Sequence, residues 1–172
     1  MKRIMIIGQP GSGKSTLARQ LGEGTGLPVV HIDQIHWKPG WVEREKSEKT
    51  VLCHNVHQRE EWIFEGGHSA TWPERLDRSD TLIWLDFPLW LRLWRVVARS
   101  LRDYGKTRPD LPENCPERFN SELYLWIWNT RHSSRAKMGR FFDSAGEGKR
   151  RYKFSNARQV QGFLYQLDTT RV

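Results

Sequence analysis

The sequence predicts an α/β fold of three layers, in which a parallel β-sheet lies between two layers of helices. Short apolar runs that are typical of buried strands alternate along the chain with longer stretches of helical periodicity. This alternation favours a parallel sheet, because each pair of parallel strands needs a helix-length crossover. A glycine-rich segment between the first strand and the first helix is a second signal. The length of 172 residues fits one domain, which we expect over residues 1–172.

The first half of the chain supplies three of the five expected strands. Apolar runs predict strands over residues 3–7, 29–32 and 62–65. The first helix is expected over residues 14–22, where a cluster of glycines ends it. After the second strand we expect a loop rich in proline, glycine and tryptophan, and then a charged helix over residues 43–60.

The second half of the chain completes the pattern. The fourth strand, over residues 81–86, ends near a proline, and an amphipathic helix over residues 89–102 follows it. A loop of proline and charged residues over 103–118 comes next. The last expected elements are helices over residues 120–131 and 135–142, a strand over residues 151–154 and a helix over residues 157–167.

Residues 8–16 read Gly-Gln-Pro-Gly-Ser-Gly-Lys-Ser-Thr, a complete GxxxxGK[ST] phosphate-binding loop, or P-loop. Its glycines allow a tight turn that directs backbone N–H groups toward an anion, and the following helix adds its positive end. Lys14 is expected to reach the β- and γ-phosphates, and the Ser15 hydroxyl to ligate Mg²⁺. The chain has no Asn-Lys-x-Asp motif for reading guanine, so we expect ATP with Mg²⁺. The loop residues expected to bind it are Gly8, Pro10, Gly11, Ser12, Gly13, Lys14, Ser15 and Thr16.

Acidic residues at the carboxyl ends of the predicted strands are candidates for the metal and the chemistry. Bound Mg²⁺ needs an acidic residue near the loop, and both Glu65 and Asp86 end apolar strands. We favour Glu65, together with Ser15, because Asp86 can instead cap the following helix. Asp33 ends the second strand and is expected to hold an acceptor hydroxyl or a magnesium-bound water. The alternative for Asp33 is a cap or a loop hydrogen bond.

The helix over residues 89–102 carries an arginine stripe opposite its apolar side chains. A solvated helix face would show the same pattern. Because the stripe leads into a loop and a later pair of arginines one turn apart, we interpret residues 103–135, approximately, as a helical lid. Arginines carried by a lid can neutralise the charge of a phosphoryl group in transfer. The stripe consists of Arg92, Arg95, Arg99 and Arg102, and the later pair of Arg131 and Arg135.

The composition restricts the class of protein without choosing a ligand. The 28 Lys and Arg exceed the 20 Asp and Glu, and the net charge of +8 suits either nucleic acid or small phosphorylated ligands. No apolar run reaches membrane-spanning length and no secretory signal is visible, so we expect a cytoplasmic protein. Cys53 and Cys115 lack the spacing of metal ligands, and we expect them to be reduced.

Nine tryptophans are a large number for this length. Most lie on apolar faces, which favours packing in the core or at a lid hinge. The alternative is a surface on which nucleic-acid bases stack. The residues in question include Trp84, Trp90, Trp94, Trp126 and Trp128.

Beyond the P-loop, two segments are more selective, namely Trp37-Lys38-Pro39-Gly40-Trp41 and Cys115-Pro116-Glu117-Arg118-Phe119. With these, and with residues 31–33, 62–69, 82–88 and 107–110, the chain resembles the nucleoside-monophosphate kinases. It is more closely similar to the adenylate-kinase-related proteins known as DNA-topology-modulation (FlaR-type) proteins. The resemblance runs nearly end to end. It implies a five-stranded parallel sheet of order 2-3-1-4-5, flanked by helices, with a helical lid.

The resemblance also implies roles for single residues. Arg95 and Arg99 match the arginines that in those kinases touch the base and the phosphates, and Arg131 and Arg135 resemble later lid arginines. The turn at Gly66-Gly67 resembles the acceptor-site turn of shikimate and gluconate kinases. The segment after the second strand lacks the arginine of the adenylate-kinase monophosphate site, so AMP is not the expected acceptor.

Together these features predict a phosphotransferase that moves the γ-phosphoryl group of ATP to a small acceptor. The acceptor is expected near Asp33, Gly66, Gly67 and Arg75. The main alternative is a nucleotide-dependent protein that binds DNA and modulates its topology, using the positive charge and the arginine stripe on phosphate backbones. The residues expected to act in catalysis are Lys14, Asp33, Arg99, Arg131 and Arg135.

Overall fold

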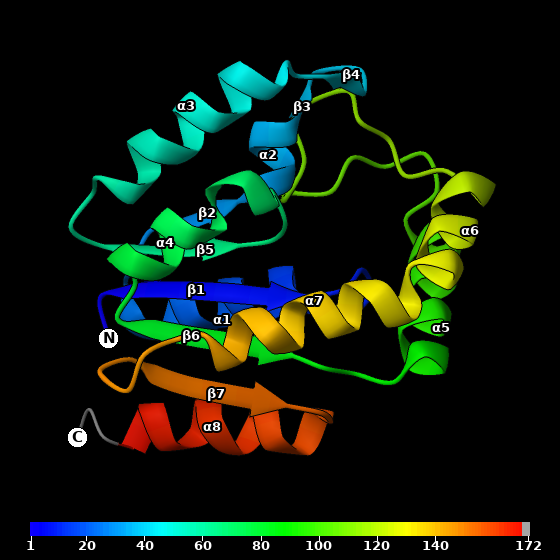
Figure 1. The fold of residues 1–172 in the computed structure, drawn as a ribbon. Helices are drawn as coiled ribbons and strands as arrows, with labels where there is room; N and C mark the ends of the chain where they lie inside the picture. Colours follow the sequence, from blue (N-terminus) through cyan, green and yellow to red (C-terminus); the bar gives the residue numbers. More distant parts are fainter. Residues whose placement is uncertain (170–172) are drawn as a thin grey trace.

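A computed structural model of the protein describes residues 1–169 and contains a central five-stranded parallel sheet (Figure 1). The order of its strands across the sheet is β2-β5-β1-β6-β7. Counted within this sheet alone, that order is 2-3-1-4-5, which confirms the predicted fold class. The last three residues of the predicted domain, 170–172, lie outside the described residues. The strands are β1 (Arg3–Gly8), β2 (Val29–His31), β5 (Trp62–Glu65), β6 (Thr81–Leu85) and β7 (Arg150–Phe154).

The central strands are apolar on both faces because helices cover both sides of the sheet. In β1, Ile4 and Ile6 belong to the core on one side, and Met5 and Ile7 belong to the core on the other. The strands are paired so that their carboxyl ends meet at one edge of the sheet, with Ile6 opposite Glu65. Side chains that follow different strands therefore gather at this edge.

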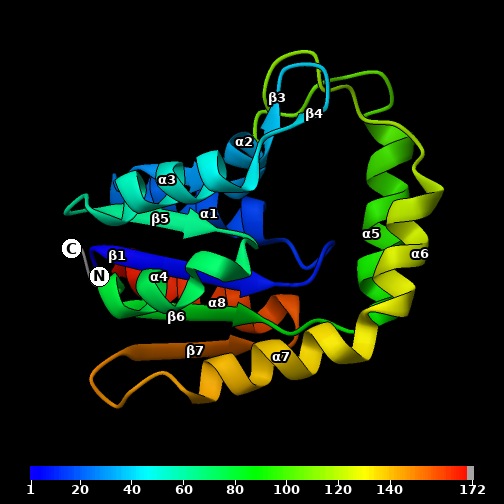
Figure 2. The ribbon, with the colours of Figure 1, turned by 45° about the horizontal axis from the view of Figure 1, so that its top comes forward.

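Two helical layers complete the sandwich (Figures 1 and 2). On one face of the sheet lie α1 (Lys14–Thr25) and α8 (Ala157–Thr169), which share a core with the strands. The other face carries three longer helices and one short one. These are α2 (Ile32–His36), α3 (Lys46–His57), α4 (Trp72–Arg78) and α7 (Arg131–Asp143).

Several boundaries differ from the predicted ones. Helix α1 continues beyond the predicted end at Gly22, because Gly26 adopts the left-handed conformation and its N–H closes the helix on the Gly22 carbonyl. The predicted loop after the second strand contains α2 and a short hairpin of β3 (Trp37–Lys38) and β4 (Val42–Glu43). Helix α4 and the 3₁₀ turn over Ser69–Thr71 were not predicted, since such short elements show too few periods to be recognised.

A pair of helices stands at the carboxyl end of the sheet, beyond the arrowheads of the strands (Figure 2). They are α5 (Leu89–Arg102), whose bounds match the prediction, and α6 (Ser121–Asn129). A hydrogen bond of 3.1 Å from the Tyr124 hydroxyl to Ser100 Oγ joins α6 to α5. The predicted lid thus consists of three parts, which are the long connection between α5 and α6, helix α6 itself and the start of α7. Within the described chain no helix is long and apolar enough to cross a membrane.

The tryptophans only partly follow the predicted packing. Trp84 is buried in the core beneath α7. By contrast, four tryptophans on α5 and α6 are exposed, so of the expected packing in the core or at a lid hinge, the core part was wrong for them. Both cysteines are free and buried, as expected for reduced thiols. The exposed set is Trp90, Trp94, Trp126 and Trp128, with exposed fractions between 49% and 71%.

Candidate active site

The P-loop connects the end of β1 to the start of α1 and adopts the tight turn that its glycines permit. Gly11 and Gly13 have φ values of +78° and +92°, which disfavour other residues. A Cβ atom on Gly11 would lie 2.3 Å from the backbone oxygen of Arg92. Only glycine therefore fits where the loop passes under α5.

A cleft of about 1170 Å³ opens at this edge of the sheet, between the P-loop, the hairpin and the α5–α6 pair. This volume is large enough for a nucleotide and a second small molecule. Every predicted nucleotide-binding residue of the loop lines it. They are Gly8, Pro10, Gly11, Ser12, Gly13, Lys14, Ser15 and Thr16.

The two predicted metal residues lie side by side in the cleft. Ser15 Oγ donates a hydrogen bond of 3.0 Å to Glu65 Oε1, and His31 Nδ1 lies 2.8 Å from the same oxygen. Burial raises the pKa of Glu65, but the hydrogen bond from His31 and the charge of Lys14 outweigh it and hold this pKa below its usual value. The carboxylate is therefore ionised beside the P-loop serine. A hydroxyl and an anionic carboxylate oxygen are a donor set that suits Mg²⁺.

Asp86, the other candidate for the metal, has a structural role. Its carboxylate accepts two hydrogen bonds from Arg135, of 2.8 and 2.9 Å, and Lys153 Nζ lies 3.4 Å away. Burial is outweighed by these cations, which lower the pKa of Asp86. The predicted cap was wrong, because Pro88 occupies the N-cap position of α5 and no side chain caps that helix. Asp86 instead anchors α7 to the end of β6.

Asp33 lines the cleft from the first turn of α2. No side-chain hydrogen bond of Asp33 occurs within residues 1–169, and His31 rather than Asp33 is the N-cap of α2. Burial and the nearby negative charge of Glu65 raise its pKa, although Lys14 and Arg108 act in the opposite direction. The cap alternative is therefore not observed, and the carboxylate remains available to a ligand.

The turn at Gly66-Gly67 lies next to Asp33 in the lining of the cleft. Gly66 has a φ of +101°, and a Cβ atom there would lie 2.2 Å from the Ile32 side chain. This close approach lets β5 pass directly beneath the start of α2. Gly67 has open space around its Cα, so its backbone is accessible from the cleft.

Three arginines of the predicted stripe, Arg95, Arg99 and Arg102, line the cleft. Arg95 Nη1 donates to the Ser12 carbonyl at 3.3 Å, and its guanidinium lies 4.8 Å from the centre of the Phe87 ring. Arg99 Nε lies 3.3 Å from Glu117 Oε2. Arg92 is buried and donates to the carbonyls of Phe87 and Pro10, so it supports the P-loop from behind. Of the four arginines only Arg102 is exposed, where it pairs with its neighbour Asp103, so the solvated-face alternative holds for this residue alone.

Three other predicted residues do not line the cleft. Arg75 is fully buried beneath the Gly66 turn, so it cannot contact an acceptor as predicted. Arg135 forms the ion pair with Asp86, and Arg131 Nη1 donates to the Trp128 carbonyl at 2.6 Å. These partners hold both guanidinium groups outside the lining of the cleft, although Ser134, Lys137 and Met138 of α7 do line it.

The sequence did not assign roles to a set of charged residues from the long connection. Arg108 Nη1 lies 2.7 Å from Asp110 Oδ2, and its Nε lies 3.0 Å from Glu117 Oε2. All three line the cleft. They fall in residues 107–110 and 115–119, two of the segments that carry the family resemblance. This resemblance was the only signal in the sequence that could have marked them as site residues.

The two segments that were singled out in the sequence, Trp37–Trp41 and Cys115–Phe119, contact each other although they are far apart along the chain. Trp41 N donates to Cys115 Sγ at 3.3 Å, and Trp41 Nε1 donates to the Pro116 carbonyl at 3.1 Å. Gly40 N donates to the Glu113 carbonyl at 3.3 Å. Trp41 has a φ of +62°, which is unusual for a bulky residue. We call this contact between residues 38–41 and 113–116 the latch, and it ties the predicted lid to the β3–β4 hairpin.

A P-loop at the end of a central parallel strand, facing two acidic residues and two arginines, defines a nucleoside-triphosphate-binding protein of the P-loop class. The AAA_18 family, described as an AAA domain, matches residues 4–118 of the chain. The chain belongs to this family.

The chain is also similar to individual proteins that are named as small-molecule kinases. A cytidylate kinase from Pyrobaculum islandicum is 26% identical over 140 residues, which cover 73% of this chain and 74% of the relative. Shikimate kinase from Bacteroides thetaiotaomicron has a TM-score of 0.59 at 16% identity, covering 99% of this chain and 98% of that one. Shikimate kinase from Acinetobacter baumannii, solved with shikimate, has a TM-score of 0.56 at 14% identity and covers 99% and 93%. These structures show the shared fold.

Proposed function

We propose that the protein is an ATP- and Mg²⁺-dependent kinase that transfers the γ-phosphoryl group to the hydroxyl or phosphate oxygen of a small acceptor. One observation carries the proposal. The Asp33 carboxylate, which has no described hydrogen-bond partner, lines the same cleft as Lys14 and Glu65. A protein that only binds ATP needs the P-loop and the metal residues. Other carboxylates of the cleft are paired with arginines, whereas Asp33, unpaired among the described residues, suits a reaction in which an acceptor must be held and deprotonated.

Each residue has a defined task in this proposal. Lys14 neutralises charge on the β- and γ-phosphates, and Arg95 and Arg99 add positive charge from α5. Asp33 orients the acceptor and, where the attacking group is a hydroxyl, accepts its proton. Gly66 and Gly67 form the turn against which the acceptor lies. Catalysis then consists of alignment of the two reactants and neutralisation of charge.

Ser15 and Glu65 are the residues that would hold Mg²⁺, since they present a hydroxyl and an ionised carboxylate beside the loop. When bound, the ion neutralises negative charge on the phosphate oxygens. Arg131 and Arg135 have no task here, because the guanidinium of the first lies on Trp128 and that of the second on Asp86.

A screen for ADP release tests the proposal. The purified protein with MgATP is offered cytidylate, shikimate and a panel of nucleosides, sugars and hydroxy acids. We expect at least one acceptor to raise ADP release well above the rate without acceptor, and Asp33→Asn to remove this increase. If no acceptor exceeds the basal rate, the kinase proposal is wrong.

The finer resemblance to DNA-topology-modulation proteins suggests DNA binding as the alternative, and the structure gives it little support. The arginine stripe of α5 would have to face a phosphate backbone. Arg92 is instead buried, Arg95 and Arg99 contact groups inside the cleft, and only Arg102 is exposed. We therefore favour the small-molecule kinase.

A further inference from the structure

The segment of residues 66–72 forms the acceptor side of the cleft and has an unusual support. Gly66, Gly67, His68, Ser69 and Trp72 from this segment line the cleft. Beneath them lies Arg75, a fully buried arginine. Burial lowers the pKa of Arg75 to about 10, so it is still charged at neutral pH. No carboxylate within the described chain forms an ion pair with it. A buried cation without such a partner is costly and calls for an explanation.

Two contacts of Arg75 lead to this segment. Its Nη1 donates to the Gly66 carbonyl at 3.0 Å, and its Nη2 lies 3.5 Å from Thr71 Oγ1. Its guanidinium lies 3.6 Å from the centre of the Phe64 ring, on the strand that leads into the turn. One rigid planar group therefore joins both ends of the acceptor segment to β5.

His57 contacts the remaining nitrogen of the guanidinium, Nε. Arg75 Nε lies 3.3 Å from His57 Nε2, and an arginine nitrogen can only donate. The Nε2 atom of His57 must therefore be an acceptor, and the proton of the neutral ring is on Nδ1. That proton is directed at Glu74 Oε2, 3.0 Å away. Burial lowers the pKa of His57, and the charge of Arg75 acts in the same direction, although Glu74 opposes it.

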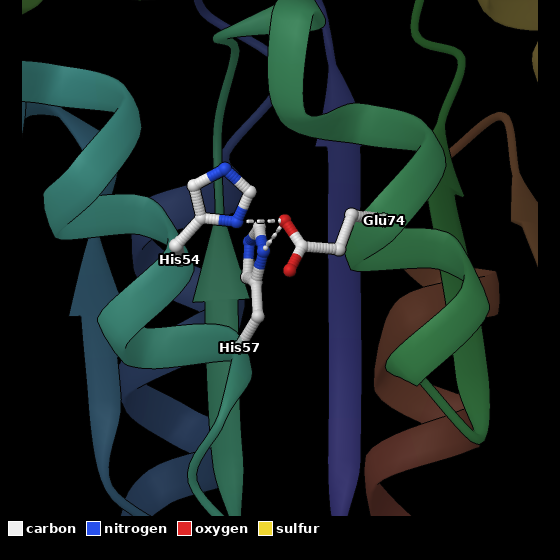
Figure 3. A group of neighbouring side chains, drawn as sticks. All are labelled: His54, His57 and Glu74. Carbon is white, nitrogen blue, oxygen red and sulfur yellow. Dashed lines mark hydrogen bonds and ion pairs between the residues drawn. The ribbon is translucent and has the colours of Figure 1, made fainter. Parts of the chain in front are cut away.

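His54, His57 and Glu74 come together closely enough to suggest a metal site (Figure 3). Both histidines approach the same Glu74 oxygen through Nδ1. A metal ion would need the lone pair of His57 Nδ1, which would force the proton onto Nε2, against the donor of Arg75. The contact with Arg75 thus favours a hydrogen-bonded support over a metal centre.

We propose that Arg75, oriented by His57 and Glu74, is a positioning residue that fixes residues 66–72 for binding of the phosphoryl acceptor. This inference rests on the proposed kinase function. It assigns a task to a buried arginine, a buried histidine and an acid that do not touch the reactants. Loss of His57 should let the guanidinium reorient and the Gly66 turn shift.

The kinetic test uses the full chain and three variants. His57→Leu removes the acceptor of Arg75, whereas His57→Gln offers an amide that can both accept from Arg75 and donate to Glu74. His54→Gln is the matched control, since His54 touches Glu74 from the same helix without touching Arg75. The acceptor is cytidylate or shikimate, or whichever compound of the panel supports ADP release.

We expect His57→Leu to raise the acceptor KM by about tenfold to a hundredfold, the scale of small misplacements of bound groups. The KM for ATP should change by less than about threefold in the same variant, since the P-loop is a separate element. His57→Gln should restore the acceptor KM, and His54→Gln should leave it at the wild-type value. Equal changes in both KM values, or no change in either, would overturn the positioning role.

Hydrogen exchange of backbone amides decides the same question without an acceptor. In His57→Leu, we expect exchange of the Gly66 and Thr71 amides to become faster by roughly tenfold relative to amides of β7. Uniform acceleration throughout the sheet would show a general loss of stability and overturn the proposal. Absence of ADP release from the wild type with every acceptor would overturn the kinase function, and the two failures are thereby distinguished.

Discussion

At the scale of single residues, the proposed function assigns phosphate binding and proton transfer to different side chains of the cleft. Lys14 lines the cleft and donates within the protein only to the Gln9 carbonyl, at 3.5 Å, among the contacts of the described chain. Its charge is therefore available to a ligand. Asp33 and Glu65 lie in the same cleft, but the environment raises the pKa of the first and lowers that of the second. Two carboxyl groups with opposite shifts are suited to different tasks.

Replacement of Lys14 tests the phosphate-binding task. We expect Lys14→Ala to weaken ATP binding by about tenfold to a hundredfold or more, because a charge-assisted hydrogen bond contributes about 1.5–3 kcal/mol. Calorimetric titration with MgATP measures the affinity. Lys2→Ala is the control, since Lys2 is an exposed lysine paired with Glu61. Wild-type affinity in Lys14→Ala would contradict the assignment of the P-loop.

Replacement of Asp33 tests the proton-accepting task. We expect Asp33→Asn to lower kcat by roughly 10²–10⁴-fold, the usual contribution of a general base. In the wild type the base must be ionised, so activity should be present above the pKa of Asp33 and lost as pH falls through it. Because burial and Glu65 raise this pKa, the loss should begin at a higher pH than an ordinary aspartate would give. Persistence of the same acidic limb of kcat/KM in Asp33→Asn would contradict this role.

At the scale of elements, the latch joins the predicted lid to the β3–β4 hairpin. Its partners, residues 38–41 and 113–116, belong to segments that are far apart in sequence but are hydrogen-bonded to each other. Cys115 Sγ is central, since it accepts from Trp41 N and lies 3.7 Å from the Lys38 carbonyl. Residues of both segments line the cleft, so we expect the hairpin and the connection to move together when the cleft closes.

Replacement of Cys115 tests the latch. Cys115→Ala leaves the part-buried Trp41 N–H without its acceptor, a loss of about 0.5–1.5 kcal/mol. We expect faster amide exchange over residues 104–118 with little change in the central sheet. Cys53→Ala is the matched control, because Cys53 is also a buried free thiol but belongs to the core beneath α3. Equal acceleration of the connection in both variants would rule out a specific role for Cys115.

At the scale of the whole molecule, the cleft lies between the edge of the sheet and the α5–α6 pair, which makes few core contacts. A ligand there touches the P-loop, α5 and the connection at once. Binding should therefore stabilise the folded chain as a unit, since the unfolded chain has no such site.

Thermal unfolding measures this linkage. With MgATP at a hundred times its Kd, the gain is about 2.7 kcal/mol. For a chain of this size the midpoint should rise by roughly 5–11 °C, at about 2–4 °C per kcal/mol. Lys14→Ala should show little of this increase at the same ATP concentration. An equal rise in this variant would place the stabilising site away from the P-loop.

The sequence by itself determined the architecture and the nucleotide site. Alternating apolar runs and helical periods reflect local burial, and they predicted the five strands and the bounds of α5. The order of the strands was predicted from the family resemblance. The P-loop could be recognised because its residues are consecutive in sequence and its turn depends on its own glycines rather than on distant elements. Asp33 and Glu65 could be placed because they follow strands that end at one edge.

Only the tertiary structure decided which side chains face the cleft. Arg75 reads as a ligand-binding residue in the sequence, but the docking of α4 on α3 and β5 directs it beneath the Gly66 turn. Arg131 and Arg135 lie outside the lining of the cleft, because the first donates to the Trp128 carbonyl and the second takes Asp86 as its partner. The physical reason is that periodicity reports which residues are buried along one element. The direction of a charged side chain depends on which distant element packs beside it and supplies its partner.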